Sequence, residues 1–394
     1  MNVLYITKTS PFSGGGGGEK RAREVTKRLA ERGHDITIFC GKTDPDLPKH
    51  MERDGCTVRH VTCIPDQAHR FSTVAFYSAR YLFPVVSIPI LASFLFTRSI
   101  DVVLENMTPY PTPAVVLAKV FGTPIVAVQH EFFDWSIYST YGPLSATIQL
   151  IVQNFLRIFD YDTIIVPTSH VKSRFVEYGV DGSRIEVVPN GVNWRRFHLP
   201  EVESHHANLV TVGRLSKRKG QSDVLEAVER LHREHGDVTL DVIGAGPARS
   251  RLENLTTQLD ISDQVTFHGY VSDEKKIELL NRAEIFVFAS RQEGFGLVLL
   301  EAMSAGLPVV ARELPVYHEF FTHGQNGFLV EEPVEDNLAS KISSLINNDS
   351  KLLEIGKVNK DTASRYDWER TATETKEILE ELVRVNQRSN AKSS

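Results

Sequence analysis

The chain has 394 residues, of which 41% are hydrophobic and 24% charged, so it is long enough for two or three domains with buried cores. Fifty acidic against 44 basic residues leave a formal charge of −6, which excludes an overall basic field and argues against a nucleic-acid partner. Three cysteines without C-x-x-C spacing support neither a disulfide framework nor a zinc site. With an N-terminus that reads as a strand and not a signal peptide, we expect a cytoplasmic protein.

The first half of the chain alternates short apolar strands with helical segments. Strand Val3 to Thr7, the glycine run Gly14 to Gly18 and helix Glu19 to Arg32 lead into a second strand and form a βαβ unit. The four later strands are expected at Asp35 to Cys40, Asp101 to Leu104, Pro124 to Val128 and Thr163 to Pro167. This α/β alternation favours a parallel sheet covered on both faces, and we place the first domain at residues 1–195.

A polar stretch from Pro200 to Asn208 separates a second α/β domain, which we place at residues 196–365. Its helices include one at Gln221 to His235, and a long amphipathic helix is expected at Tyr366 to Asn386. Its five expected strands are Asn208 to Val212, Val238 to Ile243, Gln264 to Phe267, Ile285 to Ala289 and Pro308 to Val310.

Ligands of open parallel sheets bind at the carboxyl ends of the strands, which directs attention to the loops there. The loop G-R-L-S-K-R-K-G follows a buried strand and places Gly213, Arg214 and Lys219 before a helix. Glycines and basic side chains in this position suit a diphosphate. A solvated basic turn is the alternative interpretation of the same residues.

A second loop reads S-R-Q-E-G-F-G-L-V-L-L-E-A-M-S-A and contains Glu293 and, in the following helix, Glu301. If that helix begins at Leu297, the backbone N–H groups around Gly296 and Leu297 form an anion site. Glu301 lies in an apolar context where an unpaired carboxylate would be costly to bury, so we expect it to face a ligand. An ordinary exposed helix residue is the alternative.

Two further features lie in the first domain. The glycine run lacks the acidic residue that a dinucleotide site would place near the end of the second strand, which disfavours an NAD-dependent oxidoreductase. His130 follows an apolar strand, where its side chain would enter a cleft. The D-x-D strings at Asp44 and Asp160 have no third ligand nearby, so we expect no required metal.

Several segments in order resemble the family 4 glycosyltransferases, which have the GT-B fold of two facing Rossmann-like domains. The similarity rests on P-F-S-G-G-G-G-G-E with R-G-H-D-I-T, on V-V-P-N-G-V-N, on V-G-R-L-S-K-R-K-G and on E-G-F-G-L-V-L-L-E-A-M-S-A-G-L-P-V-V, an E-x7-E signature. The resemblance implies retaining transfer of a hexose-type sugar from a nucleotide-sugar donor to a hydroxyl of a glycan or lipid-linked acceptor. It implies no cofactor and no essential metal, and a closing helix that returns to the first domain.

The resemblance also implies roles for individual residues. Arg214 and Lys219, with the amides of Gly296 and Leu297, would hold the diphosphate and stabilise the leaving charge. Glu301 would bind the ribose, Glu293 the transferred sugar, and His130 a sugar hydroxyl. The remaining donor-binding positions are Phe295, Gly213, His268, Gly269, Gly16 and Gly17. An epimerase or phosphorylase of the same fold and a non-catalytic nucleotide-sugar binding protein are the alternatives.

The longest apolar run extends from Tyr81 to Phe96 and is flanked by Arg80 and Arg98. It is too short to span a bilayer and contains two prolines. Two interpretations remain: a helix that lies on the inner face of the membrane and reaches a lipid-linked acceptor, or a helix that covers the core of the first domain.

Overall fold

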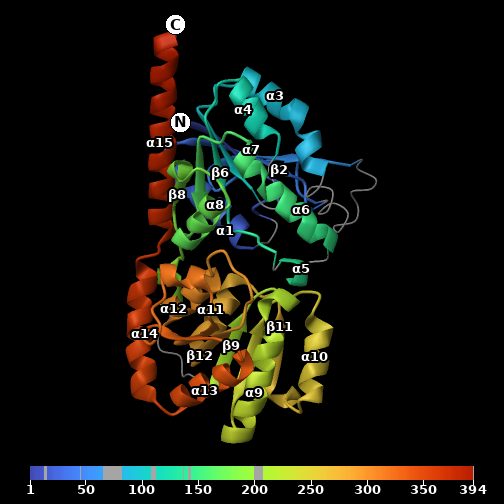
Figure 1. The fold of residues 1–394 in the computed structure, drawn as a ribbon, viewed down its shortest axis with the longest axis vertical. Helices are drawn as coiled ribbons and strands as arrows, with labels where there is room; N and C mark the ends of the chain where they lie inside the picture. Colours follow the sequence, from blue (N-terminus) through green and yellow to red (C-terminus); the bar gives the residue numbers. More distant parts are fainter. Residues whose placement is uncertain are drawn as a thin grey trace. The chain divides into compact units, whose positions relative to one another are not determined.

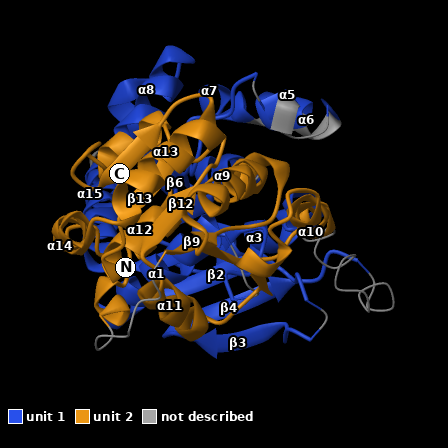
Figure 2. Cartoon of the chain, turned by 90° about the horizontal axis from the view of Figure 1, so that it is seen from below, with its two compact units in different colours: residues 1–190, 368–394 blue, residues 191–367 orange. Residues whose placement is uncertain are grey.

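The computed structural model describes residues 1–12, 16–44, 46–64, 82–107, 112–135, 137–140, 143–198 and 207–393. The chain forms two compact units, Met1–Asn190 with Trp368–Ser394 (unit 1) and Gly191–Asp367 (unit 2) (Figures 1 and 2). The sequence analysis placed this boundary after residue 195 and the return of the chain at Tyr366. Within the described ranges, no helix is both long enough and apolar enough to cross a bilayer.

Unit 1 contains an eight-stranded sheet in the order β3-β4-β2-β1-β5-β6-β7-β8. All neighbouring strands pair in parallel except β3 and β4. The central strands are continuous apolar runs because both of their faces are buried. The strands are β1 (Asn2–Thr7), β2 (Asp35–Gly41), β3 (His50–Arg53), β4 (Cys56–Val61), β5 (Val102–Asn106), β6 (Ile125–Val128), β7 (Thr163–Val166) and β8 (Ile185–Val187).

The helices of unit 1 include the C-terminal helix of the chain, which packs beside the first one (Figure 1). Glu369 at the start of α15 pairs with Arg28 of α1 at 2.7 Å and with Arg32, which caps α1, at 2.9 Å. The helices are α1 (Gly17–Glu31), α3 (Ile88–Thr97), α4 (Ala114–Val120), α5 (Ile137–Thr140), α6 (Pro143–Gln153), α7 (Phe155–Ile158), α8 (Ser169–Glu177), α15 (Trp368–Ser393) and the short 3-10 turn η2 (Gly182–Arg184).

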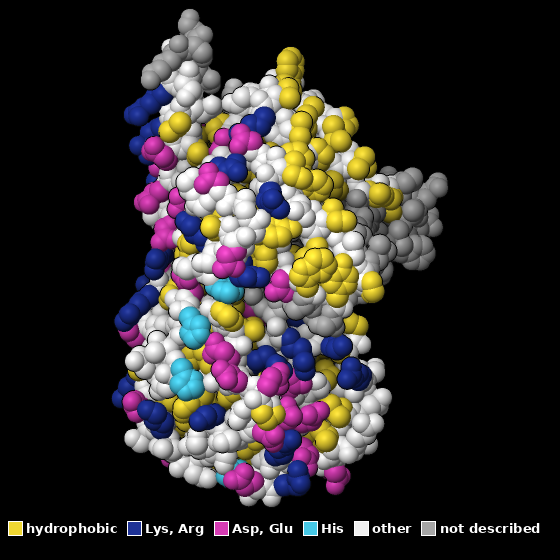
Figure 3. All heavy atoms as spheres, viewed as in Figure 1, with side chains coloured by type: hydrophobic (Ala, Val, Ile, Leu, Met, Phe, Trp, Pro, Cys, Tyr) yellow, Lys and Arg dark blue, Asp and Glu magenta, His cyan; other side chains and the backbone are white. Residues whose placement is uncertain are grey.

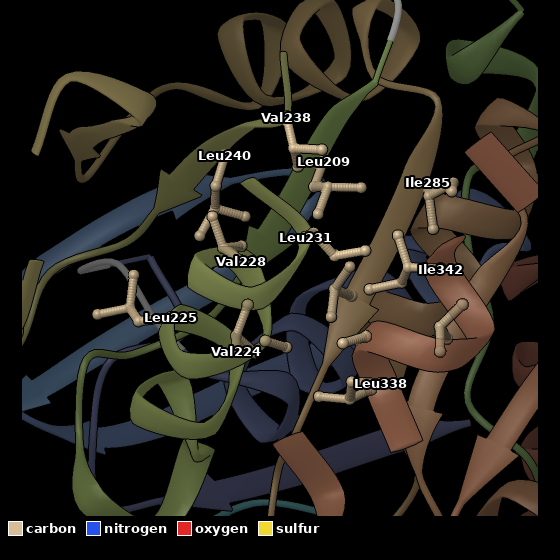
Figure 4. Close-up of a cluster of buried hydrophobic side chains, with 14 of the residues drawn as sticks. Leu209, Val224, Leu225, Val228, Leu231, Val238, Leu240, Ile285, Leu338 and Ile342 are labelled. Atoms are coloured by element: carbon tan, nitrogen blue, oxygen red, sulfur yellow. The ribbon is translucent and has the colours of Figure 1, made fainter. Parts of the chain in front are cut away.

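Unit 2 contains a six-stranded, wholly parallel sheet in the order β11-β10-β9-β12-β13-β14. Side chains from β9, β10 and β12 point toward those of α9 and α13 and form a buried apolar cluster (Figure 4). The strands are β9 (Asn208–Val212), β10 (Thr239–Ile243), β11 (Val265–Gly269), β12 (Ile285–Phe288), β13 (Val309–Arg312) and β14 (Gly327–Val330).

The helices of unit 2 follow its strands in alternation. Two of them flank the loops that matter for the site: α9 follows β9, and α12 follows β12. The helices are α9 (Gln221–His235), α10 (Arg249–Gln258), α11 (Asp273–Arg282), α12 (Leu297–Ala305), α13 (Val334–Ile346) and α14 (Asp349–Ser364), with 3-10 turns η3 (Trp194–Phe197), η4 (Lys217–Lys219), η5 (Ser262–Gln264) and η6 (Pro315–Glu319).

Candidate active site

Two loops at the carboxyl ends of β9 and β12 are hydrogen-bonded to each other. The backbone N–H of Arg291 donates to the carbonyl of Arg218 (2.8 Å), and Nε of Arg218 donates to the carbonyl of Gln292 (3.0 Å). Gly220 has a φ of 65°, and a Cβ there would lie 2.0 Å from the carbonyl oxygen of Ala289, so only glycine permits this approach. Because β9 and β12 are neighbours in the sheet, the basic and acidic loops form one edge of unit 2.

Lys219 and Glu293, which come from these two loops, form an ion pair at that edge. The Arg218 guanidinium lies 4.0 Å from the second carboxylate oxygen, and Nζ of Lys219 lies 5.4 Å from the centroid of the Phe288 ring. Burial raises the pKa of Glu293, but Lys219 and Arg218 outweigh it and hold the pKa below its ordinary value. The structure therefore brings together two predicted residues as one ionised pair.

Arg214 differs from Lys219 because its side chain is exposed. Its backbone carbonyl accepts a hydrogen bond from Nε2 of Gln221 (3.1 Å), which ties the basic loop to the first turn of α9. The N–H of Gly213 donates to the carbonyl of Ile243 (2.9 Å) and continues the pairing of β9 with β10. The loop backbone is thus fixed at both ends, while Arg214 itself is exposed.

Helix α12 begins at Leu297, the start on which the expected anion site depends, and Gly296 caps it with a φ of 94° and no side-chain hydrogen bond. The first-turn N–H groups of such a helix have no intrahelical acceptor and attract an anion. A Cβ on Gly296 would lie 2.7 Å from Cε1 of Tyr317, a fully buried residue whose hydroxyl has no hydrogen-bond partner within the described residues. The helix N-terminus is therefore packed tightly against an aromatic ring.

The side chain of Phe295 lies in the core of unit 2. Its ring is 3% exposed and lies 5.1 Å from the ring of Phe320 and 6.3 Å from that of Tyr366, measured between centroids. A donor contact at this predicted position would therefore come from the backbone of Phe295.

Glu301 is buried, but it has a basic partner. Its Oε1 lies 3.0 Å from Nζ of Lys276 in α11, which also lies 3.2 Å from Asp273. Burial lowers the pKa of Lys276, but Glu301 and Asp273 outweigh it and raise the pKa above its ordinary value. The expectation that an unpaired carboxylate at Glu301 requires a ligand was therefore wrong in its premise, because the pair with Lys276 offsets the cost of burial.

His268 and Gly269 end β11, next to β10. Nε2 of His268 lies 2.6 Å from Oδ1 of Asp241, and the carbonyl of Gly269 accepts a hydrogen bond from the N–H of Gly244 (2.8 Å). Tyr270 follows directly and is 78% exposed. The polar groups of His268 and Gly269 thus hold two strand ends together and leave an exposed aromatic ring beside them.

In unit 1, His130 follows β6 and is hydrogen-bonded through Nε2 to Oδ1 of Asn106 at the end of β5 (2.8 Å). The carbonyl of Asn106 accepts a hydrogen bond from Nζ of the buried Lys8 (3.0 Å). Burial, reinforced by the positive charges of Arg21 and Lys8, lowers the pKa of His130 to about 3. The imidazole is therefore neutral at physiological pH.

The described part of the glycine run begins at Gly16, which caps α1, and continues through Gly17, the first residue of that helix. The N–H of Gly16 donates to Oε2 of Glu19 (3.1 Å). Gly18 lies closest to His130: a Cβ there would be 3.1 Å from the Nε2 atom of the ring. The structure thus brings the glycine segment and His130 together within unit 1, whereas Gly14 and Gly15 lie outside the described residues.

Neither D-x-D string forms a metal cluster within the described residues, where no group of three or more His, Cys, Asp or Glu side chains could hold a cation. Asp160 pairs with Arg184 at 2.9 Å and with Lys119 at 3.4 Å. Asp162 also pairs with Lys119, at 2.7 Å.

Sequence reasoning did not single out several residues that support these groups. Asn106 ends a strand, so the rule that selected His130 could also have found it. Arg218 is adjacent to Lys219 in the same basic loop. Lys276 carries no comparable signal, because its approach to Glu301 depends on how α11 packs against α12.

Comparisons with known proteins cover nearly the whole chain. A model of Glycosyltransferase Family 4 matches residues 15–196, and one of Glycosyl transferases group 1 matches residues 201–362. Glycogen synthase from Mycobacterium tuberculosis is 26% identical, over 96% of this chain and 94% of its own. Sucrose-phosphate synthase from Thermosynechococcus elongatus has a TM-score of 0.80 and 20% identity, covering 98% of this chain and 99% of its own. HepE from Anabaena in complex with UDP-glucose has a TM-score of 0.73 and 18% identity, covering 97% and 100%.

Proposed function

The chain belongs to the group 1 and family 4 glycosyltransferases and has the GT-B architecture, and we propose that it transfers a hexose-type sugar from a nucleoside-diphosphate sugar to an acceptor hydroxyl with retention at the anomeric carbon. The acceptor is a glycan or a lipid-linked glycan. The observation that carries the proposal is the edge of unit 2 where the basic loop is hydrogen-bonded, through Arg218, to Arg291 and Gln292 in the loop that leads into α12.

This edge has the chemistry that a departing nucleoside diphosphate needs. Arg214 and Lys219 bind the phosphate oxygens, and the first-turn amides of α12 at Leu297 add the positive end of the helix dipole. The amides are held in place by the backbone of α12, and together with the two basic side chains they stabilise the charge that develops on the leaving oxygen. HepE in complex with UDP-glucose makes UDP-sugars the first donors to test.

Further donor contacts follow from the positions of the other predicted residues. Glu293 binds the transferred sugar, and Glu301 binds the ribose; each of these carboxylates is paired with a lysine in the structure, Glu293 with Lys219 and Glu301 with Lys276. The segment from His268 to Gly269 lies beside the base, and Gly213 and Gly296 allow close approach of the backbone to the phosphates. In unit 1, His130 with Gly16 and Gly17 contacts the sugar and phosphate.

The proposed transfer requires no divalent cation, because side chains and helix amides supply the positive charge that a metal would otherwise contribute. Arg214 is exposed and carries a permanent charge, and Lys219 lies beside it in the same loop. We expect activity to persist in excess EDTA. A complete loss in EDTA, restored by Mg²⁺ or Mn²⁺, would contradict this part of the proposal.

The donor can be identified by thermal shift with a panel of nucleoside diphosphates and nucleoside-diphosphate sugars, because a ligand of the folded state raises the melting temperature. The stabilising donor is then incubated with glycan and lipid-linked acceptors, and the anomeric configuration of the product is read from its NMR coupling constant. A product with inverted configuration would overturn retention. Hydrolysis of the donor with no acceptor product would overturn transfer.

We propose in addition that unit 1 contacts the inner face of the membrane through an apolar surface on α3 and α4. Hydrophobic side chains gather over these helices (Figure 3). The side of α3 formed by Leu91, Phe94 and Leu95 is buried, so this helix also covers the core. The apolar surface comprises the exposed side chains of Leu82, Val85, Ile88, Ile90, Phe96, Val116, Val120 and Phe121.

Charge supports an anionic bilayer as the partner of this surface. Residues 82–98 and 112–121 contain no Asp or Glu, although the whole chain has a net charge of −6. Their charged residues are Arg98, which is exposed, and Lys119, which pairs with Asp160 and Asp162 outside these segments. Apolar side chains with basic residues beside them favour the headgroup boundary of anionic lipid. Tyr81, which the sequence analysis included in this run, lies outside the described residues.

Flotation with vesicles that contain phosphatidylglycerol tests this contact. The double variant Phe96→Ser/Val120→Ser removes side chains that are 79% and 72% exposed, and we expect it to bind roughly tenfold more weakly. The control Leu353→Ser/Val385→Ser removes exposed apolar side chains from α14 and α15 and should float like the wild type. Equal flotation of the two double variants, or no flotation of the wild type, would refute the contact.

A further inference from the structure

The surroundings of His130 indicate a more specific role than contact with a sugar. Its ring lies at the carboxyl edge of the unit 1 sheet, where β6 and β5 are neighbours. Nε2 lies 2.8 Å from Oδ1 of Asn106, a side chain that is 2% exposed. Gly18 of α1 also approaches the ring so closely that a Cβ would lie 3.1 Å from Nε2 and 3.2 Å from Cδ2. The ring is therefore confined by two separate elements.

The charges that face this ring oppose its protonation. Lys8, at the end of β1, donates to the carbonyl of Asn106 at 3.0 Å, and Arg21 of α1 donates to Oδ1 of Asn190 at 2.8 Å. The nearest acidic group on β5 is Glu105, which is engaged by the N–H of Thr112 and by the Tyr161 hydroxyl.

A neutral imidazole has one N–H donor and one bare nitrogen that accepts a hydrogen bond. The carbonyl oxygen of the Asn106 amide only accepts, so a neutral ring bonded to it carries its proton on Nε2. Nδ1 is then the acceptor, and within the described residues it has no hydrogen-bond partner. Burial, Arg21 and Lys8 lower the pKa of His130 to about 3, which agrees with a ring that stays neutral.

We propose that Asn106 is a positioning residue that fixes His130 as the Nε2–H tautomer, so that Nδ1 accepts a hydrogen bond from a hydroxyl of the sugar substrate. This inference rests on the proposed function, since it assigns the partner of Nδ1 from the donor sugar. The same inference excludes one catalytic role for His130. A ring with this tautomer and these basic neighbours does not act as the general base for the acceptor hydroxyl.

The substitution Asn106→Asp separates positioning from a structural role. The carboxylate keeps the shape of the amide, but its negative charge stabilises the imidazolium, in which both nitrogens carry protons and neither accepts. We expect the KM of this variant for the donor to rise about tenfold per pH unit below the new pKa of the ring, while the wild-type KM stays constant from pH 5.5 to 8.5. Asn386→Asp makes the same change at a half-buried, hydrogen-bonded asparagine in α15; it is the matched control and should keep the wild-type profile.

Long-range ¹H–¹⁵N NMR spectra of the histidine rings give a readout that does not depend on activity. The His130 signals are assigned by their loss in His130→Gln, and we expect the Nε2–H tautomer across the same pH range in the wild type. In Asn106→Leu, which removes the acceptor, the tautomers should mix and the donor KM should rise equally at every pH. These spectra also show whether each variant is folded.

The outcomes distinguish this proposal from the proposed function. An Nδ1–H tautomer in the wild type, or a donor KM of Asn106→Asp that parallels the wild type at all pH values, overturns the role of Asn106 even where sugar transfer is demonstrated. If the wild type transfers no sugar from any donor, the proposed function fails, and with it the sugar hydroxyl as the partner of Nδ1. In that case the NMR spectra still decide whether Asn106 fixes the ring.

Discussion

If Lys219 binds a diphosphate as proposed, it must exchange one partner for another, because Glu293 already engages its ammonium group. The exchange is favourable only if the phosphate oxygens replace the lost ion pair and Glu293 gains another contact. Arg218, 4.0 Å from the same carboxylate, limits the cost by remaining as a positive neighbour. A sugar hydroxyl that donates to Glu293 would complete the exchange, which couples recognition of the sugar to recognition of the diphosphate.

Lys219→Ala tests this residue directly. We expect kcat/KM to fall by about 100-fold or more, because the variant loses a positive charge that stabilises the leaving group. The variant should also be less stable by about 1–3 kcal/mol, since the buried carboxylate of Glu293 loses its direct partner and keeps only Arg218, at 4.0 Å, as a positive neighbour. Steady-state kinetics and urea denaturation measure the two effects separately.

Two further variants separate the catalytic effect of Lys219 from its effect on stability. Lys219→Ala/Glu293→Gln removes the buried charge as well, so stability should recover while activity does not. Lys217→Ala removes an exposed lysine from the same loop and should leave both quantities unchanged. Full activity in Lys219→Ala, or an equal loss in Lys217→Ala, would refute the assignment of Lys219.

The start of α12 offers a test at the scale of an element. Gly296→Ala forces an alanine into a φ of 94° and directs its Cβ to within 2.7 Å of the Tyr317 ring. The left-handed conformation alone costs about 1–2 kcal/mol, and the contact displaces either the ring or the first turn of the helix. We expect donor affinity, measured by calorimetry, to fall because the amides of that turn move.

Gly324→Ala is the matched control for this prediction. Gly324 also has a positive φ, 81°, but nothing lies within 4 Å of a Cβ at that position. It should lose a similar amount of stability through backbone strain and keep the wild-type donor affinity. Equal donor affinity in both variants would show that the first turn of α12 does not bind the donor.

At the scale of elements, the best-predicted helices and strands are those marked by residues within or next to the element itself. The helix at Gln221–His235 and the start of α12 agree with the prediction, because glycines with positive φ mark both helix starts. The sequence analysis missed β3, β4, β8 and β14. The hairpin of β3 and β4 carries Asp54-Gly55 at its turn, a strong hairpin signal, but the charged residues in these strands masked it.

Local patterns selected residues of the candidate site, but they did not predict the contacts between these residues. Lys219 and Glu293 are separated by 74 positions in the sequence, and they meet because β9 and β12 are neighbours although two strands intervene in the chain. Lys276 reaches Glu301 for a similar reason, through the packing of α11 on α12. Local patterns indicate which residues follow which strand, whereas strand order depends on the packing of the whole unit.

At the scale of the whole molecule, the connectivity of the chain constrains where the C-terminal helix α15 lies within unit 1. Unit 1 is discontinuous, because Trp368–Ser394 belongs to it although the whole of unit 2 intervenes. In unit 2, the N–H of Val192 donates to the carbonyl of Tyr366 (2.7 Å), so the segments that enter and leave the unit are paired. In unit 1, the Thr371 hydroxyl donates to the carbonyl of Pro189 (2.8 Å). Helix α15 is thus fixed next to the end of the first segment of unit 1.

Trp368, the first residue of α15, anchors this return and is fully buried. Trp368→Ala would leave a cavity that costs about 3–5 kcal/mol. Because Trp368 belongs to unit 1, hydrogen exchange should accelerate in peptides from β1 and α1 and remain slow in those from β9 and α9, whose apolar cluster is separate. Trp135→Ala, which removes a side chain 78% exposed in the same unit, should leave both sets unchanged. Acceleration of equal size in both units would show that α15 stabilises the whole chain as one cooperative body, and no acceleration would show that the return of the helix contributes little to unit 1.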